Sequence, residues 1–98
     1  MKFSLIIRPE AEADLADAYD WYERQREGLG AEFLSSVNDG MKLIRGNPRL
    51  FPVIRKEAHR ALIHRFPYGI LFVIHGEIVS VVGVFHASRD PKSWDERL

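Results

Sequence analysis

The stretch 68-YGILFVIHGEIVSVVGVFH-86 decides the fold of this chain. Two runs rich in β-branched and aromatic residues flank a short turn that contains glycine, which is the pattern of a β-hairpin. A two-residue loop at His75-Gly76 would set the strand register, because side chains alternate between faces with a period of two. The expected cross-strand pairs are Ile74 with Glu77, Phe72 with Val79, and Ile70 with Val81.

Both faces of this hairpin are apolar. Alternation places one set of side chains on the first face, namely Tyr68, Ile70, Phe72, Val79, Val81 and Phe85. The opposite face is expected to carry Leu71, Val73, Ile78, Val82 and Val84. Two helices lying side by side cover only one face of a small sheet. The second face must therefore be covered by the C-terminal segment, by a second copy of the chain in a homodimer, or by another protein.

Upstream of the hairpin, the sequence predicts one strand and two helices. Residues 2–8 alternate as a short opening strand. Pro9 suits the first position of a helix, and apolar residues at helical spacing continue to about Arg26. Glycines at positions 28 and 30 interrupt this pattern, and a second apolar stripe then runs from Phe33 to Ile44. The short connection makes the two helices antiparallel neighbours.

The remaining segments complete an α+β single domain over residues 1–98. Residues 51–54 and 60–65 are strand-like, and Asp90 followed by Pro91 predicts a helical turn that carries Trp94 and Leu98. The expected order is β-α-α-β-β-β. It comprises an N-terminal strand, an antiparallel helical hairpin packed on an antiparallel sheet, and a short C-terminal helix.

The balance and distribution of charge limit the kinds of partner that this chain can bind. Lys plus Arg and Asp plus Glu number 14 each, so the net charge is zero, which argues against binding nucleic acid over the whole surface. The charges are nevertheless segregated, with eight acids between Glu10 and Glu32 and seven bases between Lys42 and Arg65. Along the first helix, the acids expected on the solvent side are Glu10, Asp14, Asp17 and Asp20.

The absence of cysteine excludes disulfides and thiolate metal sites, and it fits a reducing compartment. No signal-peptide core is apparent, and no apolar run reaches the ~20 residues that span a bilayer. We therefore expect a cytoplasmic protein with no membrane partner.

Few residues are candidates for chemistry. The four histidines, His59, His64, His75 and His86, lack the spacing of a zinc site, so no metal or cofactor is expected. Cleavage of RNA through its own 2′-hydroxyl needs only a proton donor, a proton acceptor and cations for the phosphate. His86 with Arg60, Arg65 and Arg89 could supply that set. The alternative is that these arginines pair with acidic side chains or lie exposed on strand edges.

Several short motifs follow one another along nearly the whole chain, and their order and spacing are characteristic. They are Ala11–Asp14–Leu15, Tyr19–Tyr22, Phe33, Pro48, Arg60, Phe66–Pro67–Tyr68 and the ending His86…Arg89…Pro91…Trp94…Arg97. In this order and spacing the chain resembles the RelE/ParE superfamily of bacterial type II toxins, and it leans to the ParE-like branch. The resemblance implies a growth-inhibiting toxin held inactive by an antitoxin, whose C-terminal segment wraps along the helical hairpin and the sheet.

The two branches of that superfamily imply different targets. ParE-like toxins inhibit DNA gyrase and trap it with cleaved DNA, whereas RelE-like toxins cleave mRNA on the ribosome. The zero net charge, and Trp94 where a nuclease might present tyrosine, depart from the nuclease branch. We therefore expect a gyrase inhibitor that is not an enzyme.

The resemblance and the residue pattern together assign residues to two expected roles and leave two other functions open. In the gyrase inhibitor, the residues expected to be exposed for target binding are Arg89, Trp94 and Arg97. The residues expected to contact the antitoxin are Tyr19, Trp21, Tyr22 and Leu43. A ribosome-dependent mRNA endonuclease that uses His86 is the alternative, and an inactive interaction domain is the third.

Overall fold

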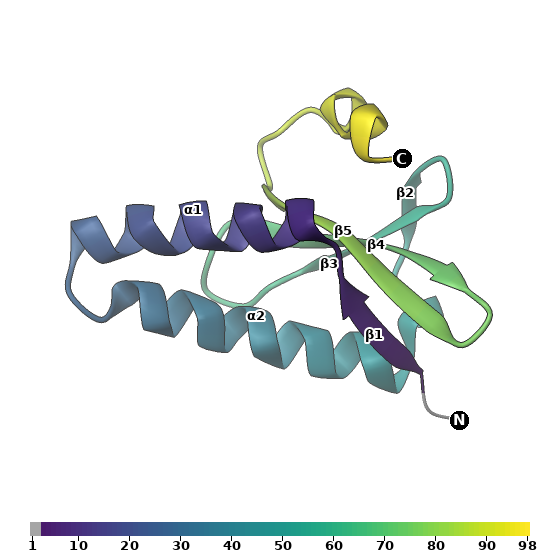
Figure 1. Ribbon diagram of the computed structural model, residues 1–98, viewed down its shortest axis with the longest axis horizontal. Coiled ribbons are helices and arrows are strands. Elements are labelled where there is room, and N and C mark those ends of the chain that lie inside the picture. The colour runs from purple at the N-terminus through teal and green to yellow at the C-terminus, as the bar shows by residue number, and fades with distance from the viewer. Residues whose placement is uncertain (1–2) are drawn as a thin grey trace.

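A five-stranded sheet with two helices on one face forms the body of the molecule (Figure 1), as seen in a computed structural model that describes residues 3–98. The strand order is β1-β5-β4-β3-β2. Strands β2 (Val53–Arg55), β3 (Ala58–Leu62), β4 (Tyr68–His75) and β5 (Ile78–His86) form an antiparallel meander. Strand β1 (Ser4–Ile7) joins β5 in parallel, so the sheet is mixed. The predicted order β-α-α-β-β-β is confirmed, and the short strand β2 is added to it in the segment that was expected to be strand-like. The expectation of an antiparallel sheet holds for the meander but not for β1, which is parallel to β5.

The helical hairpin consists of α1 (Pro9–Gln25) and α2 (Leu29–Gly46). Gly28 turns the chain between them with φ +88°, a left-handed conformation that favours glycine. The Glu23 carboxylate accepts the backbone N–H groups of Gly28 and Gly30, each at 2.9 Å, and so satisfies two donors where α2 begins. Gly30 also lets Tyr19 approach, because a Cβ atom at Gly30 would lie 2.7 Å from the Tyr19 ring. Within residues 3–98, neither helix is long and apolar enough to cross a membrane.

The main core lies between the helices and one face of the sheet. Its largest fully buried side chains are Phe33, Ile44, Ile70, Phe72, Val79 and Val81. Both helices contribute residues at helical spacing and the strands contribute alternate residues, so this core follows from the two periodicities of the sequence.

The predicted loop of the β4–β5 hairpin is displaced by one residue, so each predicted cross-strand partner is wrong by at least two residues. The loop is Gly76-Glu77, so His75 pairs with Ile78, Ile74 with Val79, and Phe72 with Val81. Gly76 has φ +60°, and a positive φ at the first loop residue is the place that glycine takes in a type II′ turn. Glycine therefore opens the loop here, whereas the predicted register had it closing the loop.

A β-bulge in β5 also changes the predicted faces. Phe72 pairs with Val81 but Leu71 pairs with Gly83, so one extra residue interrupts the alternation. Beyond the bulge, Val84 lies in the helix-side core and Phe85 lies on the opposite face, the reverse of the prediction. The residues before the bulge keep their predicted faces.

The second face of the sheet is covered by the C-terminal segment. Its core consists of Ala58, Leu71, Val82, Phe85 and Trp94, with Ile54 and Val73 packed at its margin. Trp94 comes from η2 (Pro91–Arg97), which is a 3₁₀ helix, and its side chain is only 2% exposed. As predicted, Asp90 caps this turn, since its carboxylate accepts the Lys92 N–H at 3.0 Å. Of the three possible covers for this face, the chain itself supplies one.

Candidate functional site

An ion pair joins the C-terminal segment to α1. Arg97 Nη1 lies 2.8 Å from Asp14 Oδ2, and Nη2 lies 3.0 Å from Oδ1, so the contact is bidentate. Arg97 also donates to the Val82 carbonyl at 3.0 Å, and Asp14 accepts the Val84 N–H at 3.0 Å. Hydrogen bonding to Asp14 raises the pKa of Arg97 above its ordinary value, against the opposing effect of burial. The expectation that Asp14 lies on the solvent side of α1 is wrong.

A second ion pair ties the same segment to the edge of the sheet. Arg55 in β2 contacts Asp95 through two hydrogen bonds of 2.8 Å each. These bonds hold the pKa of Asp95 below its usual range, and the charges of Arg55 and Lys56 act in the same direction. The 3₁₀ helix is therefore held on one side by α1 and on the other by β2.

The three residues expected to bind the target lie around one aromatic ring. Arg89 and Arg97 place their guanidinium groups 4.5 and 4.9 Å from the Phe85 ring centre, and Trp94 stacks on the same ring at 6.1 Å. Arg89 is exposed, and it has no acidic partner within 4.0 Å among residues 3–98. The expectation that Trp94 is exposed is wrong, because its indole ring packs into the core of the second face.

Of the four residues of the predicted nuclease set, the structure brings only His86 and Arg89 together, in one depression beside Tyr68. His86 pairs with Tyr68 across the strands and packs against its ring at 5.3 Å, on the helix side of the sheet. Arg60 aligns with Leu71 and therefore lies on the opposite face. Arg65 lies beyond β3 and pairs with Glu32 of α2 at 2.7 Å.

His86 and Arg65 thus have structural partners of their own. The His86 Nδ1 accepts the backbone N–H of Ser88 at 3.1 Å, and the Ser88 Oγ lies 2.8 Å from the same nitrogen. Arg65 matches the alternative expectation of an arginine that pairs with an acid.

The residues expected to contact an antitoxin fall into two groups. Tyr22 is buried in an aromatic cluster with Phe33, Phe66 and Tyr68, and this burial raises the pKa of its hydroxyl. The expectation of a surface contact at Tyr22 therefore disagrees with the structure. Trp21 is 51% exposed and Leu43 is 68% exposed, so both can contact a partner.

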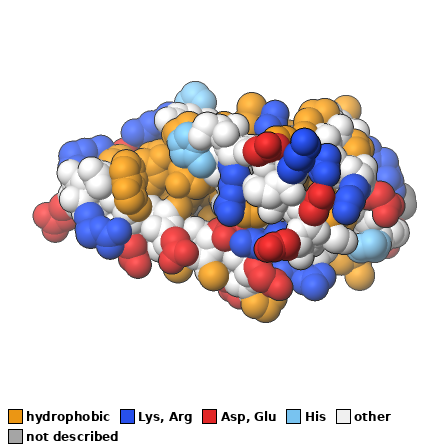
Figure 2. Space-filling view, turned by 90° about the horizontal axis from the view of Figure 1, so that it is seen from above, with side chains coloured by type: hydrophobic (Ala, Val, Ile, Leu, Met, Phe, Trp, Pro, Cys, Tyr) orange, Lys and Arg blue, Asp and Glu red, His pale blue; other side chains and the backbone are white. Residues whose placement is uncertain are grey.

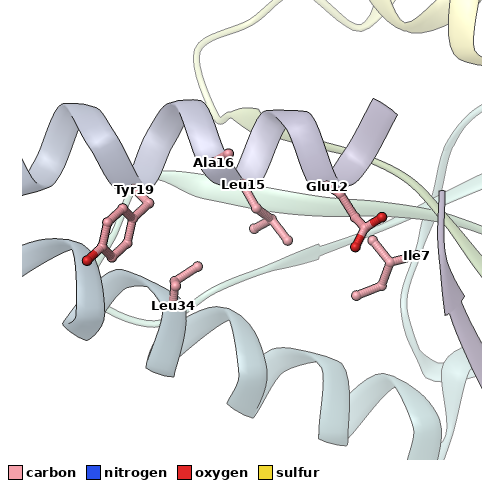
Figure 3. Close-up of a pocket in the computed structure, with 6 residues that line it drawn as sticks. All are labelled: Ile7, Glu12, Leu15, Ala16, Tyr19 and Leu34. Atoms are coloured by element: carbon pink, nitrogen blue, oxygen red, sulfur yellow. The ribbon is translucent and has the colours of Figure 1, made fainter. Parts of the chain in front are cut away.

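An apolar groove lies between α1 and α2 and includes Tyr19 (Figure 3). It has a volume of about 370 Å³ and is lined by Ile7, Glu12, Leu15, Ala16, Tyr19 and Leu34. Among residues 3–98, Glu12 is the only charged residue that lines the groove. Sequence reasoning identified Tyr19 but missed the other lining residues, because Leu15 and Leu34 lie on stripes that also supply the core. The sequence signal that could have identified them is the width of the apolar stripes. A stripe wider than the face that packs on the core leaves apolar residues for a second surface.

The opposite side of α1 and the C-terminal segment present a different surface. Acidic and basic side chains are interspersed over it, and an apolar area lies toward the tip of the helical hairpin (Figure 2). Among residues 3–98, no cluster of three or more His, Asp or Glu side chains is arranged to hold a metal ion.

The fold is shared with solved toxin–antitoxin structures. A chain of the chromosomal ParDE toxin–antitoxin system from P. aeruginosa has a TM-score of 0.79 at 16% identity, covering 89% of this chain and 98% of that chain. A chain of the toxin–antitoxin complex RelBE2 from Mycobacterium tuberculosis has a TM-score of 0.65 at 18% identity, covering 88% and 99%. Identities this low show a common fold alone.

The sequence itself shows the family. No curated protein sequence matches this chain. The family model described as the ParE toxin of the type II toxin-antitoxin system, parDE, matches residues 5–91. The chain therefore belongs to this family of toxins, and the resemblance to the RelE/ParE superfamily that the motifs indicated is confirmed.

Proposed function

We propose that this toxin stops bacterial growth by binding DNA gyrase, without catalysing a reaction. The observation that carries the proposal is the separation of the nuclease candidates, with His86 and Arg60 on opposite faces of the sheet. Acid–base chemistry on RNA needs the proton-transferring group and the phosphate-binding cations around one phosphate. The family match favours the ParE-like branch, for which gyrase is the expected target.

The proposed target-binding element is the C-terminal segment from Arg89 to Arg97. Arg89 is an exposed cation of this segment, lies over the Phe85 ring, and is proposed to contact gyrase directly. Trp94 and Arg97 act indirectly, because the buried indole and the ion pair with Asp14 hold the segment on the sheet. Because these contacts already hold the segment on the sheet, binding through Arg89 requires less ordering of the backbone.

The proposed neutralising partner is an antitoxin whose segment occupies the apolar groove. A groove of this size between two helices suits aliphatic side chains of a bound peptide. Tyr19 lies in the groove, and the exposed Trp21 and Leu43 are proposed as further contacts around the hairpin.

A supercoiling assay tests the target. Purified toxin is incubated with gyrase, ATP and relaxed plasmid, and the expected result is loss of supercoiling together with trapped, cleaved DNA. Arg24→Ala, an exposed arginine of α1 outside this segment, serves as the matched control for Arg89→Ala. Unchanged supercoiling at excess toxin would reject the proposal. Codon-linked mRNA cleavage on translating ribosomes would favour the endonuclease instead.

A further inference from the structure

A second depression lies at the opposite end of α2 from the hairpin tip. It has a volume of about 210 Å³ and is lined by Phe3, Lys42, Arg45 and Gly46. Arg49, which follows in the 3₁₀ turn η1 (Pro48–Leu50), places its guanidinium 5.8 Å from the Phe3 ring centre. We call the set Phe3, Lys42, Arg45 and Arg49 the basic site.

The cations of the basic site have no acidic partners within the chain. Among residues 3–98, no acid lies within 4.0 Å of the side-chain nitrogens of Lys42, Arg45 or Arg49. In contrast, Arg55, Arg65 and Arg97 each form an ion pair shorter than 3.0 Å. Favourable interaction with the C-terminal end of α2 accounts for Arg45, but Arg49 lies beyond the helix end.

The basic site and the apolar groove are two ends of one surface. Leu34 in the groove, Asn38, and then Lys42 and Arg45 follow one another at helical spacing on α2. Strand β1 runs beside them, from the C-terminal end of α2 toward the start of α1, with Phe3 adjoining one depression and Ile7 lining the other (Figure 1). At ~1.5 Å per helical residue, the two ends are about 12–17 Å apart.

We infer that the antitoxin segment carries an aliphatic side chain in the groove and acidic side chains on the basic site. This inference rests on the proposed antitoxin function. An extended peptide covers about 12–17 Å in roughly four to five residues, which sets the spacing between the two anchors. The surface also fixes the direction of the peptide, because Glu12 at the groove would repel the acidic end.

An acidic peptide fits this surface better than nucleic acid does. The aromatic ring of Phe3 lies among the cations, and the groove that continues the surface has only one charged residue. The phosphate backbone of a duplex offers no apolar group to fill such a groove.

The test compares charge variants of the toxin in binding to full-length antitoxin, purified from the co-expressed complex. The variants are K42E/R45E, the neutral K42Q/R45Q, and the control R24E/K92E, which makes the same charge change at exposed positions elsewhere. Circular dichroism and thermal unfolding verify that each variant is folded. If K42E/R45E does not fold, the comparison is made with K42Q/R45Q instead. A duplex oligonucleotide of about 20 base pairs is titrated in parallel.

The expected result is at least a tenfold rise in Kd for K42E/R45E at 0.1 M salt, mainly through slower association, with a smaller rise for K42Q/R45Q. The difference should shrink at 0.5 M salt, and the control should stay within about twofold. Equal Kd values for K42E/R45E and the control would overturn the inference while leaving the antitoxin function standing. Loss of DNA binding with unchanged antitoxin binding would overturn it in favour of a polyanion. If the unmodified toxin does not bind the antitoxin, both proposals fail.

Discussion

Asp14 and Arg97 lie 83 residues apart in the sequence and form a bidentate ion pair beside the β5 bulge. Strand β1 ends opposite Val81, so the backbone of β5 has no strand neighbour on that side beyond this point. The ion pair replaces the missing strand, because Asp14 accepts the Val84 N–H and Arg97 donates to the Val82 carbonyl. One contact thus joins α1, the bulge and the segment that covers the second face.

Removal of Asp14 should therefore destabilise the fold. Asp14→Ala leaves Arg97 and the Val84 N–H without their acceptor in a mostly buried position. We expect the free energy of unfolding in urea to fall by about 2–3 kcal/mol. Asp17→Ala, on the exposed side of α1, should change it by less than about 0.5 kcal/mol. Equal effects of the two substitutions would show that the ion pair contributes little.

The Arg55–Asp95 pair should make stability depend on acid pH. The pKa of Asp95 lies below its ordinary 3.8 because of Arg55, so the unfolded chain binds a proton at a higher pH than the folded chain does. The stabilisation is complete at pH 6 and is lost as the pH falls below 3.8 through the lowered pKa. Urea unfolding should show Asp95→Asn less stable than the unmodified chain at pH 6, with the gap closing in acid.

The control for this pH dependence is Glu96→Gln, at an exposed position with no basic partner within 4.0 Å among residues 3–98. Its stability should follow that of the unmodified chain from pH 6 downward. A gap for Asp95→Asn that stays constant in acid would contradict the assignment.

Burial of Trp94 can be read from fluorescence. The chain has two tryptophans, so Trp21→Phe leaves Trp94 as the only one. We expect a blue-shifted emission that iodide quenches weakly, because the indole is 2% exposed. Adding Arg97→Ala should release the segment and raise the quenching several-fold, whereas Lys92→Ala should not. Strong quenching before Arg97 is changed would show that the segment does not cover the sheet.

The glycines of α2 offer a matched pair for packing. A Cβ atom at Gly30 would lie 2.7 Å from the Tyr19 ring, whereas one at Gly46 would have no atom within 4 Å. Gly30→Ala should lower the free energy of unfolding by about 1–3 kcal/mol. Gly46→Ala should leave it unchanged or raise it by up to about 1 kcal/mol, since alanine favours helix. Thermal unfolding of both variants checks this, and similar melting temperatures would contradict the close contact.

The sequence predicted the elements of the fold well because each had a clear period. Apolar stripes at helical spacing identified both helices, and the alternating run through Ile70 and Phe72 identified the hairpin. Local patterns do not report a bulge, however. Beyond the bulge, the Val84 N–H is bonded to Asp14, which comes from an element far away in the sequence, so no local pattern contains this contact.

The site was predicted less well, because the partner of a side chain depends on the tertiary structure and not on the local sequence. From the sequence alone, an arginine can either bind a ligand or form an ion pair. Only the structure shows that Arg65 pairs with Glu32 and that Arg97 pairs with Asp14. Trp94 was expected to be exposed because it lies in a short terminal segment. In the structure its side chain covers the second apolar face of the sheet. Both outcomes have a physical cause: an apolar face of a sheet is stabilised when it is covered, and a partly buried charge is stabilised when it is paired.

The most direct test of a non-catalytic toxin compares His86→Ala with Arg89→Glu in the gyrase supercoiling assay. We predict that His86→Ala inhibits gyrase as strongly as the unmodified toxin does, because His86 packs against Tyr68 and the proposed mode of inhibition needs no acid–base group. Arg89→Glu should lose at least tenfold in inhibition, because it reverses an exposed charge on the proposed target-binding segment. Full inhibition by Arg89→Glu together with loss of inhibition in His86→Ala would contradict the account.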